Sequence, residues 1–307
     1  MPLEIIMYHY VRPISRSAYP KIKGLEIEKF TKQIHYLKKN KKIVSTGDVI
    51  KAVNQNVDLP VGSVWLTFDD GYKDHVEFVA PILEKMGIEA CFFPVSDTYE
   101  TTCLLDVNKI HYILALSSSD NLLIQILKER MLILGYTKKD FLYLWGSVDK
   151  SSRYDSKKIM FFKKILQREL PLHIRSKILD EIFEIVVGRK QADISRELYM
   201  SKSDLRYLYK KGFTIGSHTK SHQWLNQLTY AEQKKEIVRS LEALKKITGC
   251  TNNFVMCYPY GGYNKKTLDL LKEHNCSLAV TTRKEIADLK KDNKYELPRF
   301  DTNDFPQ

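Results

Sequence analysis

Two adjacent carboxylates, Asp69 and Asp70, stand at the end of a predicted strand, in the sequence TFDDG at residues 67–71. Two like charges placed side by side cost energy unless a cation or a shared proton compensates them. The two aspartates are therefore candidates for a metal-binding or proton-transferring pair. An Asp-Asp-Gly sequence also suits an ordinary turn that begins a helix, and this second interpretation stays open at this point.

Two histidines four residues apart, His218 and His222, follow another predicted strand in the sequence HTKSH. If this segment turns helically, the two imidazoles lie on one side and could bind the same metal ion. Two histidines and one carboxylate form a ligand set for a divalent metal that leaves positions open for water and substrate. The alternative is an ordinary pair of surface histidines.

A turn rich in proline and glycine follows a third predicted strand, in the sequence VMCYPYGG at residues 255–262. Such a turn can direct a backbone N–H into a pocket, where it stabilises an oxyanion. In isolation the same sequence suits a structural loop.

Alternating strand and helix patterns place these three segments at the same kind of position. Short apolar runs predict six strands, at residues 4–11, 63–68, 89–95, 213–217, 253–258 and 277–281. Helical periodicity predicts five helices, at residues 28–39, 76–86, 203–211, 230–248 and 265–274. This rhythm predicts parallel βαβ units, in which reactive groups lie beyond the carboxyl ends of the strands.

The middle third of the chain breaks this rhythm. Apolar residues recur at helical spacing within residues 122–134, 159–166 and 178–187, while strand signals are few. We expect a helical subdomain at 97–199, inserted into a discontinuous domain made of residues 1–96 and 200–307. Such an insertion could cover the site, select the substrate, dimerise or dock on a membrane.

Composition narrows the class of protein. A chain of 307 residues, 43% hydrophobic with 13 Gly and 10 Pro, is neither fibrous nor disordered. The formal charge is +12, but no basic arm, tail or recognition motif accompanies it, so no nucleic-acid partner is expected. No apolar stretch approaches the ~20 residues of a membrane span. Five cysteines without CxxC spacing, and no charged leader at the start, favour a cytoplasmic protein with reduced thiols.

Taken together and in this order, the three segments resemble the motifs of one family, the metal-dependent polysaccharide deacetylases of carbohydrate esterase family four. The motifs are TFDDG at 67–71, HTKSH at 218–222 and YPYG at 258–261. MYHYV at 7–11 and LPRFDTND at 297–304 resemble the MYHxV motif and the late PR-x-D segment of one branch of that family. The helical middle third resembles an insertion of a subgroup associated with surface-polysaccharide gene clusters.

The resemblance implies an α/β fold, an incomplete or distorted (β/α) barrel with an inserted helical subdomain. It implies that Asp69 is the general base and that Asp70, His218 and His222 bind a divalent metal ion. This ligand set suits zinc, and also cobalt, nickel or manganese. The ion would polarise an acyl carbonyl and lower the pKa of a bound water, and the Tyr260 backbone N–H would help hold the oxyanion.

Two departures from the family pattern point to further residues. Many members have an arginine before the aromatic-proline pair to orient the base, but this chain has Cys257. We expect Arg299 with Asp301 to orient the base instead, and the thiol to be an inert buried one. The Leu-x-His motif that usually provides the general acid is missing. His9, at the end of the first strand, is the candidate acid, with a structural histidine as the alternative.

Three aromatic residues beside these motifs are candidates for binding the sugar: Trp224, Tyr258 and Tyr263. Aromatic rings suit the apolar faces of pyranose rings, although packing alone would also explain them.

We therefore expect a metal-dependent hydrolase that removes an N-acetyl or O-acetyl group from a sugar in cell-surface polysaccharide or lipopolysaccharide biosynthesis. Its substrate is expected to be a nucleotide-linked sugar or a lipid-linked glycan, because the positive charge would attract phosphate or an anionic membrane at the inner face. The alternatives are another C–N amide hydrolase, such as a deformylase, and an inactive carbohydrate-binding relative. The sequence leaves the oligomeric state open.

Overall fold

The chain folds into two compact units in a computed structural model that describes residues 1–148 and 155–307. The barrel unit consists of Met1–Pro13, Gly24–Cys103 and Ser195–Gln307, and the helical unit consists of Ile14–Lys23 and Leu104–Ile194. The helical unit lies within the predicted insertion except for Ile14–Lys23, which the sequence analysis assigned to the discontinuous domain. The outer parts of the predicted insertion, residues 97–103 and 195–199, belong to the barrel unit.

The strands that the structure describes all belong to the barrel unit. They are β1 (Pro2–Tyr8), β2 (Lys42–Ile43), β3 (Ser63–Asp70), β4 (Cys91–Pro94), β5 (Thr214–Ile215), β6 (Val255–Cys257), β7 (Leu278–Val280), β8 (Ala287–Asp288) and β9 (Phe300–Asp301). All six predicted strands are confirmed, most of them shorter than predicted.

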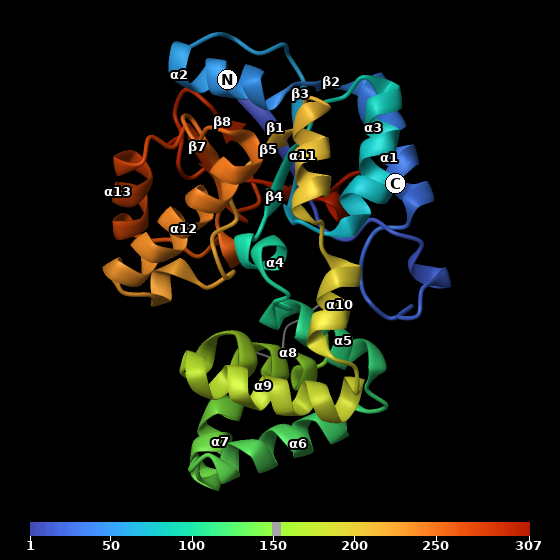
Figure 1. Cartoon of the computed structure of the whole chain (residues 1–307), viewed down its shortest axis with the longest axis vertical. Coiled ribbons are helices and arrows are strands. Elements are labelled where there is room, and N and C mark those ends of the chain that lie inside the picture. The colour runs from blue at the N-terminus through green and yellow to red at the C-terminus, as the bar shows by residue number, and fades with distance from the viewer. Residues whose placement is uncertain (149–154) are drawn as a thin grey trace. The chain divides into compact units, whose positions relative to one another are not determined.

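Helices surround these strands (Figure 1). They are α1 (Ile27–Asn40), α2 (Thr46–Gln55), the π-helical turn η2 (His75–Val79), α3 (Ala80–Met86), α4 (Ser96–Glu100), α11 (Lys202–Lys210), α12 (Tyr230–Thr248) and α13 (Lys265–Glu273). Short 3-10 turns are η4 (Leu225–Gln227), η5 (Pro259–Gly261) and η6 (Thr302–Asp304). The predicted helix 76–86 is η2 followed by α3, and the sequence analysis missed α2 and α4.

The strand order describes an incomplete barrel. The larger sheet has the order β5-β4-β3-β1-β8, and its pairs are parallel except β1 with β8; β2 also pairs with β3, and β9 with β1. The parallel strands β6 and β7 form a second sheet. Single bridges join Ser217 to Met256 and Val280 to Leu297, next to the ends of the two sheets. The predicted α/β class is confirmed.

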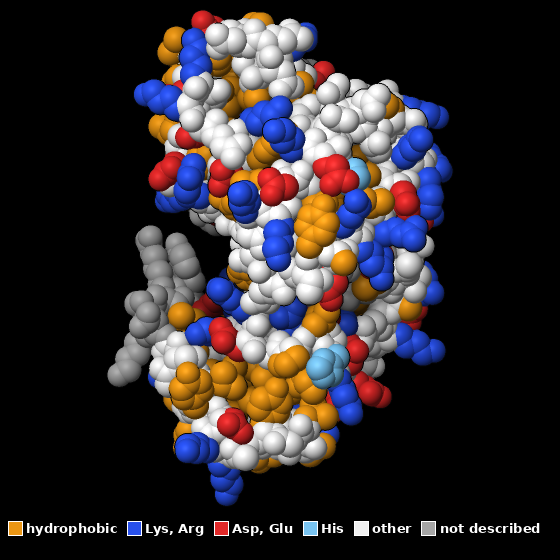
Figure 2. Space-filling view, turned by 90° about the vertical axis from the view of Figure 1, so that its left-hand side faces the viewer, with side chains coloured by type: hydrophobic (Ala, Val, Ile, Leu, Met, Phe, Trp, Pro, Cys, Tyr) orange, Lys and Arg blue, Asp and Glu red, His pale blue; other side chains and the backbone are white. Residues whose placement is uncertain are grey.

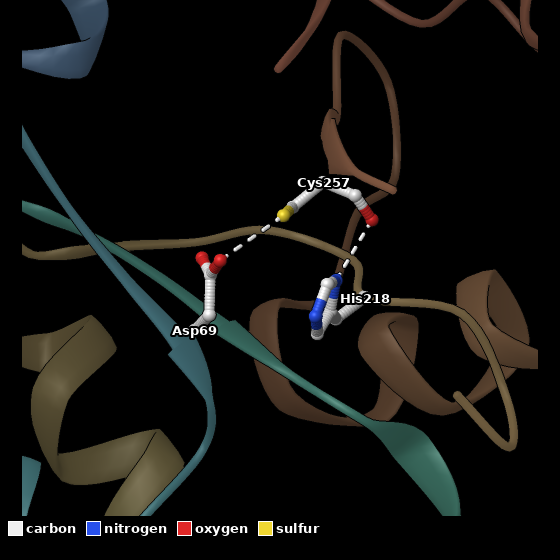
Figure 3. A group of neighbouring side chains, drawn as sticks. All are labelled: Asp69, His218 and Cys257. Atoms are coloured by element: carbon white, nitrogen blue, oxygen red, sulfur yellow. Dashed lines mark hydrogen bonds between the residues drawn. The ribbon is translucent and has the colours of Figure 1, made fainter. Parts of the chain in front are cut away.

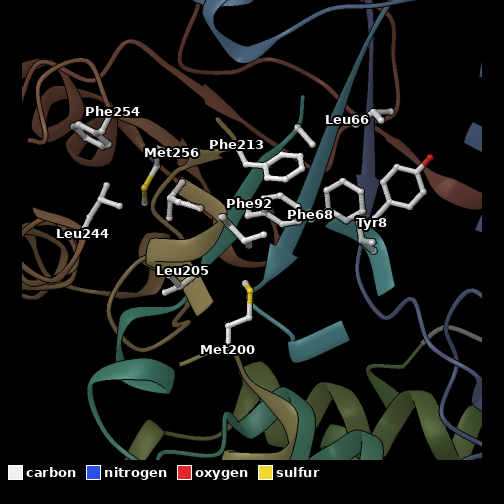
Figure 4. Packing of buried hydrophobic residues seen from close by; sticks show 14 of the residues in the cluster. Tyr8, Leu66, Phe68, Phe92, Met200, Leu205, Phe213, Leu244, Phe254 and Met256 are labelled. Atoms are coloured by element: carbon white, nitrogen blue, oxygen red, sulfur yellow. The ribbon is translucent and has the colours of Figure 1, made fainter. Parts of the chain in front are cut away.

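Two apolar layers hold the strands in place. All eight residues of β3 are buried. The outer layer packs strand residues such as Phe68 and Phe92 against the helices (Figure 4). A second cluster, around Trp65, Phe93 and Cys257, covers the other face of the strands. Because side chains alternate along a strand, Trp65 and Asp69 share this second face.

The helical unit contains η1 (Ile14–Arg16), α5 (Asp106–Leu116), α6 (Asp120–Ile133), α7 (Lys138–Gly146), α8 (Lys157–Lys164), η3 (Ile165–Glu169) and α9 (Leu172–Val187), and the first half of α10 (Gln191–Leu198). Ile14–Lys23 is fixed within it by an ion pair between Lys23 and Asp155 (2.8 Å) and by the Tyr19 ring against Tyr112. Across the described residues of both units, no helix is long and apolar enough to cross a membrane.

Candidate active site

The two predicted carboxylates end β3 and are almost fully buried, with Asp69 2% and Asp70 3% exposed. The backbone turns sharply here, since Asp70 and Gly71 have φ of 68° and 72°. A Cβ at Gly71 would lie 2.7 Å from the Pro94 Cβ, so glycine is required. Non-glycine residues rarely adopt positive φ, and three further examples, Thr219, His222 and Tyr260, belong to the two other predicted motifs.

Arg299 forms a two-pronged salt bridge with Asp69. Its Nη1 and Nη2 atoms donate to Asp69 Oδ1 at 2.9 Å and Oδ2 at 2.7 Å, and its side chain is fully buried. The Thr281 carbonyl and the Thr67 hydroxyl accept from the same guanidinium. Burial alone would raise the pKa of Asp69, but Arg299 lowers it to about 2. The carboxylate is therefore ionised and held in one orientation.

Asp70, His218 and His222 meet at one point. Asp70 Oδ1 lies 3.5 Å from His218 Nε2 and 3.3 Å from His222 Nε2. His218 Nδ1 donates to the Cys257 carbonyl (2.8 Å), so its Nε2 carries the lone pair in the neutral ring. Tyr72 donates to Asp70 Oδ2 (2.7 Å), which leaves Oδ1 buried without a hydrogen-bond partner among the described residues.

This arrangement fits a divalent metal ion. The carboxylate oxygen and the two imidazole nitrogens lie within 4.8 Å of one another and are buried. A buried carboxylate oxygen facing an imidazole lone pair is unfavourable unless a cation lies between them. The backbone carbonyl on His218 Nδ1 is also the kind of partner that orients metal-binding histidines.

Without an ion, Asp70 and His222 are held in the ionisation states that bind metals, whereas His218 is not. Burial opposes the protonation of His218, but Cys257 and Asp70 raise its pKa well above the ordinary value, so a metal ion would displace a proton from this ring. Burial opposes the ionisation of Asp70, but the His218 and His222 imidazoles hold its pKa well below the usual range. Burial lowers the pKa of His222, which keeps that ring neutral near pH 7. An ionised carboxylate with a neutral imidazole is the form that coordinates a divalent ion.

The two histidines do not lie on a helix. From their spacing alone, the sequence analysis expected them to bind the same metal ion only if this segment were helical. Residues 218–222 form a loop in which Thr219 and His222 have positive φ. Glu236 of α12 accepts hydrogen bonds from the backbone N–H groups of Lys220 and Ser221. A loop anchored in this way brings the rings to a centroid separation of 4.9 Å without helical spacing.

A second group of potential ligands, Asp69, His218 and Cys257 (Figure 3), shares His218 with the first. Cys257 Sγ is 3.4 Å from Asp69 Oδ2, and Arg299 Nη2 donates to the same sulfur at 3.0 Å. Burial raises the pKa of this thiol. A cation here would meet the guanidinium, so this group does not fit a metal ion.

His9 and Tyr260 lie at the edge of the site. His9 Nε2 is 3.9 Å from Asp69 Oδ2, and the side chain is 41% exposed, so it can meet both the carboxylate and solvent. The Tyr260 ring contacts His222 at a centroid distance of 4.6 Å. Its backbone has φ 57° inside η5, which is the turn that the sequence analysis expected to carry an oxyanion donor.

Two predicted residues lie elsewhere. Asp301 does not reach Asp69; its carboxylate caps η6 by accepting from the Asn303 backbone. Tyr258 is a core residue with 0% exposure whose hydroxyl donates to the Tyr295 carbonyl, so it is not available to a sugar. A residue at the end of a strand or just after it can face either the site or the helices, and the sequence did not distinguish these directions.

The other two predicted aromatics are half-buried. Trp224 stacks on Tyr260 at 4.7 Å with an angle of 7° between the rings. Tyr263 stacks on Tyr258, and its hydroxyl donates to Glu296. The Trp224 and Tyr260 pair adjoins His222, and Tyr263 is tied to the core.

Sequence reasoning missed Tyr72, which donates to Asp70, and left His75 without a role. Both follow the TFDDG sequence within four residues. His75 is fully buried, and its Nε2 donates to the His9 carbonyl at 2.9 Å. The sequence could have indicated both residues, because a tyrosine and a histidine closely follow the strand that ends in the two carboxylates.

A family model described as polysaccharide deacetylase matches residues 56–132 and 184–279, more than half of the chain. The chain belongs to the polysaccharide deacetylase family. This confirms the predicted resemblance, and membership implies a hydrolytic deacetylase that acts on acetylated sugar polymers. No curated protein matches the chain in sequence.

Three solved structures share the deacetylase fold of this chain. The *Streptococcus pyogenes* deacetylase PplD in complex with acetate has a TM-score of 0.61 and 18% identity over 98% of this chain and 92% of its own. IcaB from *Ammonifex degensii* has a TM-score of 0.57 and 17% identity, with 97% and 90% covered. A de-N-acetylase from *Aggregatibacter actinomycetemcomitans* has a TM-score of 0.57 and 16% identity, with 98% and 94% covered.

Proposed function

We propose that this deacetylase is metal-dependent and removes an N-acetyl or O-acetyl group from a sugar used in surface-polysaccharide or lipopolysaccharide biosynthesis. One observation carries the proposal: an ionised carboxylate, Asp69, fixed by Arg299, lies beside the buried set of Asp70, His218 and His222. A binding protein would gain nothing from such a pair of neighbouring sites. The structural relatives named as a deacetylase and a de-N-acetylase support the same chemistry.

Asp70, His218 and His222 would hold the ion, with zinc as the first candidate and cobalt, nickel or manganese as others. Such an ion polarises an acyl carbonyl and makes water a better nucleophile near neutral pH. Arg299 keeps Asp69 ionised and directed, so Asp69 accepts the proton of the attacking water. His9 is close to the same carboxylate and partly exposed, so it donates a proton to the leaving amine or alcohol. The Tyr260 backbone N–H stabilises the oxyanion.

The substrate that we favour is a lipid-linked glycan met at an anionic membrane, with a nucleotide-linked sugar as the other source of phosphate. The helical unit supports this choice, because it contains 19 Lys and Arg against 11 Asp and Glu, or +8 of the total +12. It also exposes large apolar side chains on α6 and α7, Ile133 at 70%, Leu142 at 66% and Tyr143 at 79%. Figure 2 shows apolar side chains gathered on one face of this unit, with lysines and arginines around them. Exposed apolar groups beside basic ones suit an anionic lipid surface. The cytoplasmic location stays a prediction.

Acetate and formate release from acylated nucleotide sugars and lipid-linked glycans tests the proposal. We expect acetate release by the wild type, lost on chelation and restored by a divalent ion. Asp69→Asn should lose at least about a hundredfold in kcat, because its amide cannot accept the proton, while still binding one equivalent of metal. Unchanged turnover in that variant would exclude Asp69 as the base.

His218→Ala should bind metal at least about tenfold more weakly, since it removes one of three ligands. Calorimetric titration with zinc measures this directly. The matched control is His274→Ala, because His274 at the end of α13 belongs to no ligand set. One equivalent bound at wild-type affinity by His218→Ala would refute the ligand set.

A further inference from the structure

The four residues that follow Gly71 hold the segment that carries His9. The Asp74 carboxylate accepts from the Val11 backbone N–H (3.2 Å) and from Arg12 Nε (2.7 Å). The Tyr72 ring stacks on Tyr10 at a centroid distance of 4.0 Å. The side chains of residues 72–75 therefore contact residues 9–12, in addition to the backbone pairing of β1 with β3.

His75 makes the contact closest to the proposed reaction. Its Nε2 lies 2.9 Å from the His9 carbonyl oxygen. A carbonyl only accepts, so Nε2 carries the proton. Burial lowers the pKa of His75 to about 4, so the ring is neutral near pH 7. Its Nδ1 is buried with no hydrogen-bond partner among the described residues, which leaves the bond to His9 as the polar contact that fixes the ring.

The ring of His75 is otherwise held by aromatic packing. It contacts Phe68 at 5.4 Å, Phe92 at 5.6 Å and Tyr72 at 5.8 Å between ring centroids. A phenylalanine or leucine would satisfy such a pocket without leaving a buried nitrogen unpaired. The polar ring is therefore explained by its bond to His9 and not by packing.

Residue 75 also has an unusual backbone. It begins η2, a single π-helical turn between the end of β3 and α3. An extra residue in a helical turn redirects the side chains near it, and such turns are frequent at functional sites. The turn places His75 against the end of β1, next to His9, the first residue after that strand.

We propose that His75 is a positioning residue, which holds the His9 backbone so that the His9 imidazole stays within reach of Asp69. The proposal rests on the function above, in which His9 is the general acid. The same short segment serves both halves of the site, since Tyr72 directs Asp70 and His75 directs His9. Removing the bond from His75 would release the His9 ring while leaving the metal ligands in place.

A double-mutant cycle with His9 tests the proposal. His75→Phe retains the ring volume and removes the donor. We expect kcat for acetate release to fall about tenfold to a hundredfold, with KM and zinc affinity unchanged, because a displaced acid weakens proton transfer and not binding. In the His9→Ala background the same change should cost less than about twofold, since the group that it positions is gone. An equal loss in both backgrounds would show a general structural role and overturn the proposal.

A second variant distinguishes the loss of the hydrogen-bond donor at residue 75 from a loss of the fold. His75→Gln places an amide N–H near the position of Nε2, and we expect it to recover most of the activity that His75→Phe loses. Thermal unfolding of each variant identifies a loss of fold, and His75→Leu replaces the phenylalanine variant if that one does not fold. A glutamine variant as slow as the phenylalanine variant, at equal stability, would contradict the proposal.

A measurement that does not depend on turnover tests the role of His75 separately from the proposed function. Histidine side-chain NMR signals of the zinc-loaded protein should show a changed His9 environment in His75→Phe and an unchanged one in His274→Phe. If the wild type deacetylates no sugar, the proposed function fails, and the His9 signals still decide the positioning role. An unchanged His9 signal in His75→Phe would refute it.

Discussion

The barrel unit and the helical unit carry their charges in opposite ways. In the barrel unit, Arg299, Asp69 and Asp70 are each at most 3% exposed, and the net charge of the unit is only +4. The helical unit has +8 and eight of the fifteen exposed large apolar side chains in the described chain, although it has 101 of the 307 residues. The barrel unit has a fully buried cluster of ionised groups, and the helical unit has more net positive charge and more exposed apolar side chains for its size. Chemistry is therefore expected in the first and contact with a partner surface in the second.

The largest effect should come from breaking the buried ion pair of the barrel unit. Arg299→Met leaves the Asp69 carboxylate buried without a positive partner, which costs about 3–5 kcal/mol of unfolding free energy. Acetate release should be lost as well, because the carboxylate is no longer directed. Urea unfolding and acetate release measure the two effects.

The matched change in the helical unit is Lys109→Met. Lys109 is buried and pairs with Asp106 (3.0 Å) and Asp180 (2.7 Å), but these carboxylates are 23% and 50% exposed. Water can solvate them once the lysine is gone, so we expect a loss of about 1 kcal/mol or less and unchanged kcat. A loss of unfolding free energy as large as that of Arg299→Met would contradict the proposed difference between the two units.

Much of the barrel unit could be predicted from the sequence because local patterns specify it. Short apolar runs predicted β3 and its neighbours, and the helix at 230–248 is α12, with a capping threonine before it and Gly249 after it. The three motifs come together because the ends of parallel strands share one side of a barrel.

Local patterns do not specify the contacts between distant segments. The contact of Arg299 with Asp69 spans 230 positions, and the sequence analysis expected it from the family resemblance and not from a local pattern; β9 and β3 both pair with β1, which brings the two residues together. Asp301, the last residue of β9, was expected to act with Arg299 but caps a turn instead. The assignment of Ile14–Lys23 to the helical unit likewise depends on its partners Tyr112 and Asp155. Neither the contact of Arg299 with Asp69 nor the placement of Ile14–Lys23 is indicated by a local sequence pattern.

A smaller effect should follow from changing the exposed apolar side chains of the helical unit. The double variant Leu142→Ser with Tyr143→Ser should weaken binding to vesicles containing anionic phospholipid by at least about tenfold, because each side chain loses apolar contact with lipid. Activity on a soluble acetylated sugar should not change. Cosedimentation with vesicles of matched anionic and zwitterionic composition measures the first effect.

Val61→Ser is the control in the barrel unit, because Val61 is 96% exposed and belongs to the other unit. It should leave vesicle binding unchanged. Equal losses in both variants would place the contact on both units, and wild-type binding by the double variant would contradict the proposed membrane contact. Binding that is independent of anionic lipid would remove the role of the +8 charge.

The smallest effect concerns the pH at which each unit loses stability. Burial would raise the pKa of Asp155, but Lys163 and Lys23 lower it. A carboxyl group with a lowered folded-state pKa stabilises the fold above its unfolded pKa of about 4, and that contribution disappears as the pH falls further. Asp155→Asn should therefore cost about 0.5 kcal/mol at pH 7 and nothing at pH 2. Because the pKa of Asp69 is about 2, the ion pair of the barrel unit should lose its contribution as the pH falls toward that value. Unfolding of the wild type and of Asp155→Asn between pH 2 and pH 7 measures the contribution of Asp155, and a cost that is independent of pH would show that Asp155 acts by packing instead of by charge.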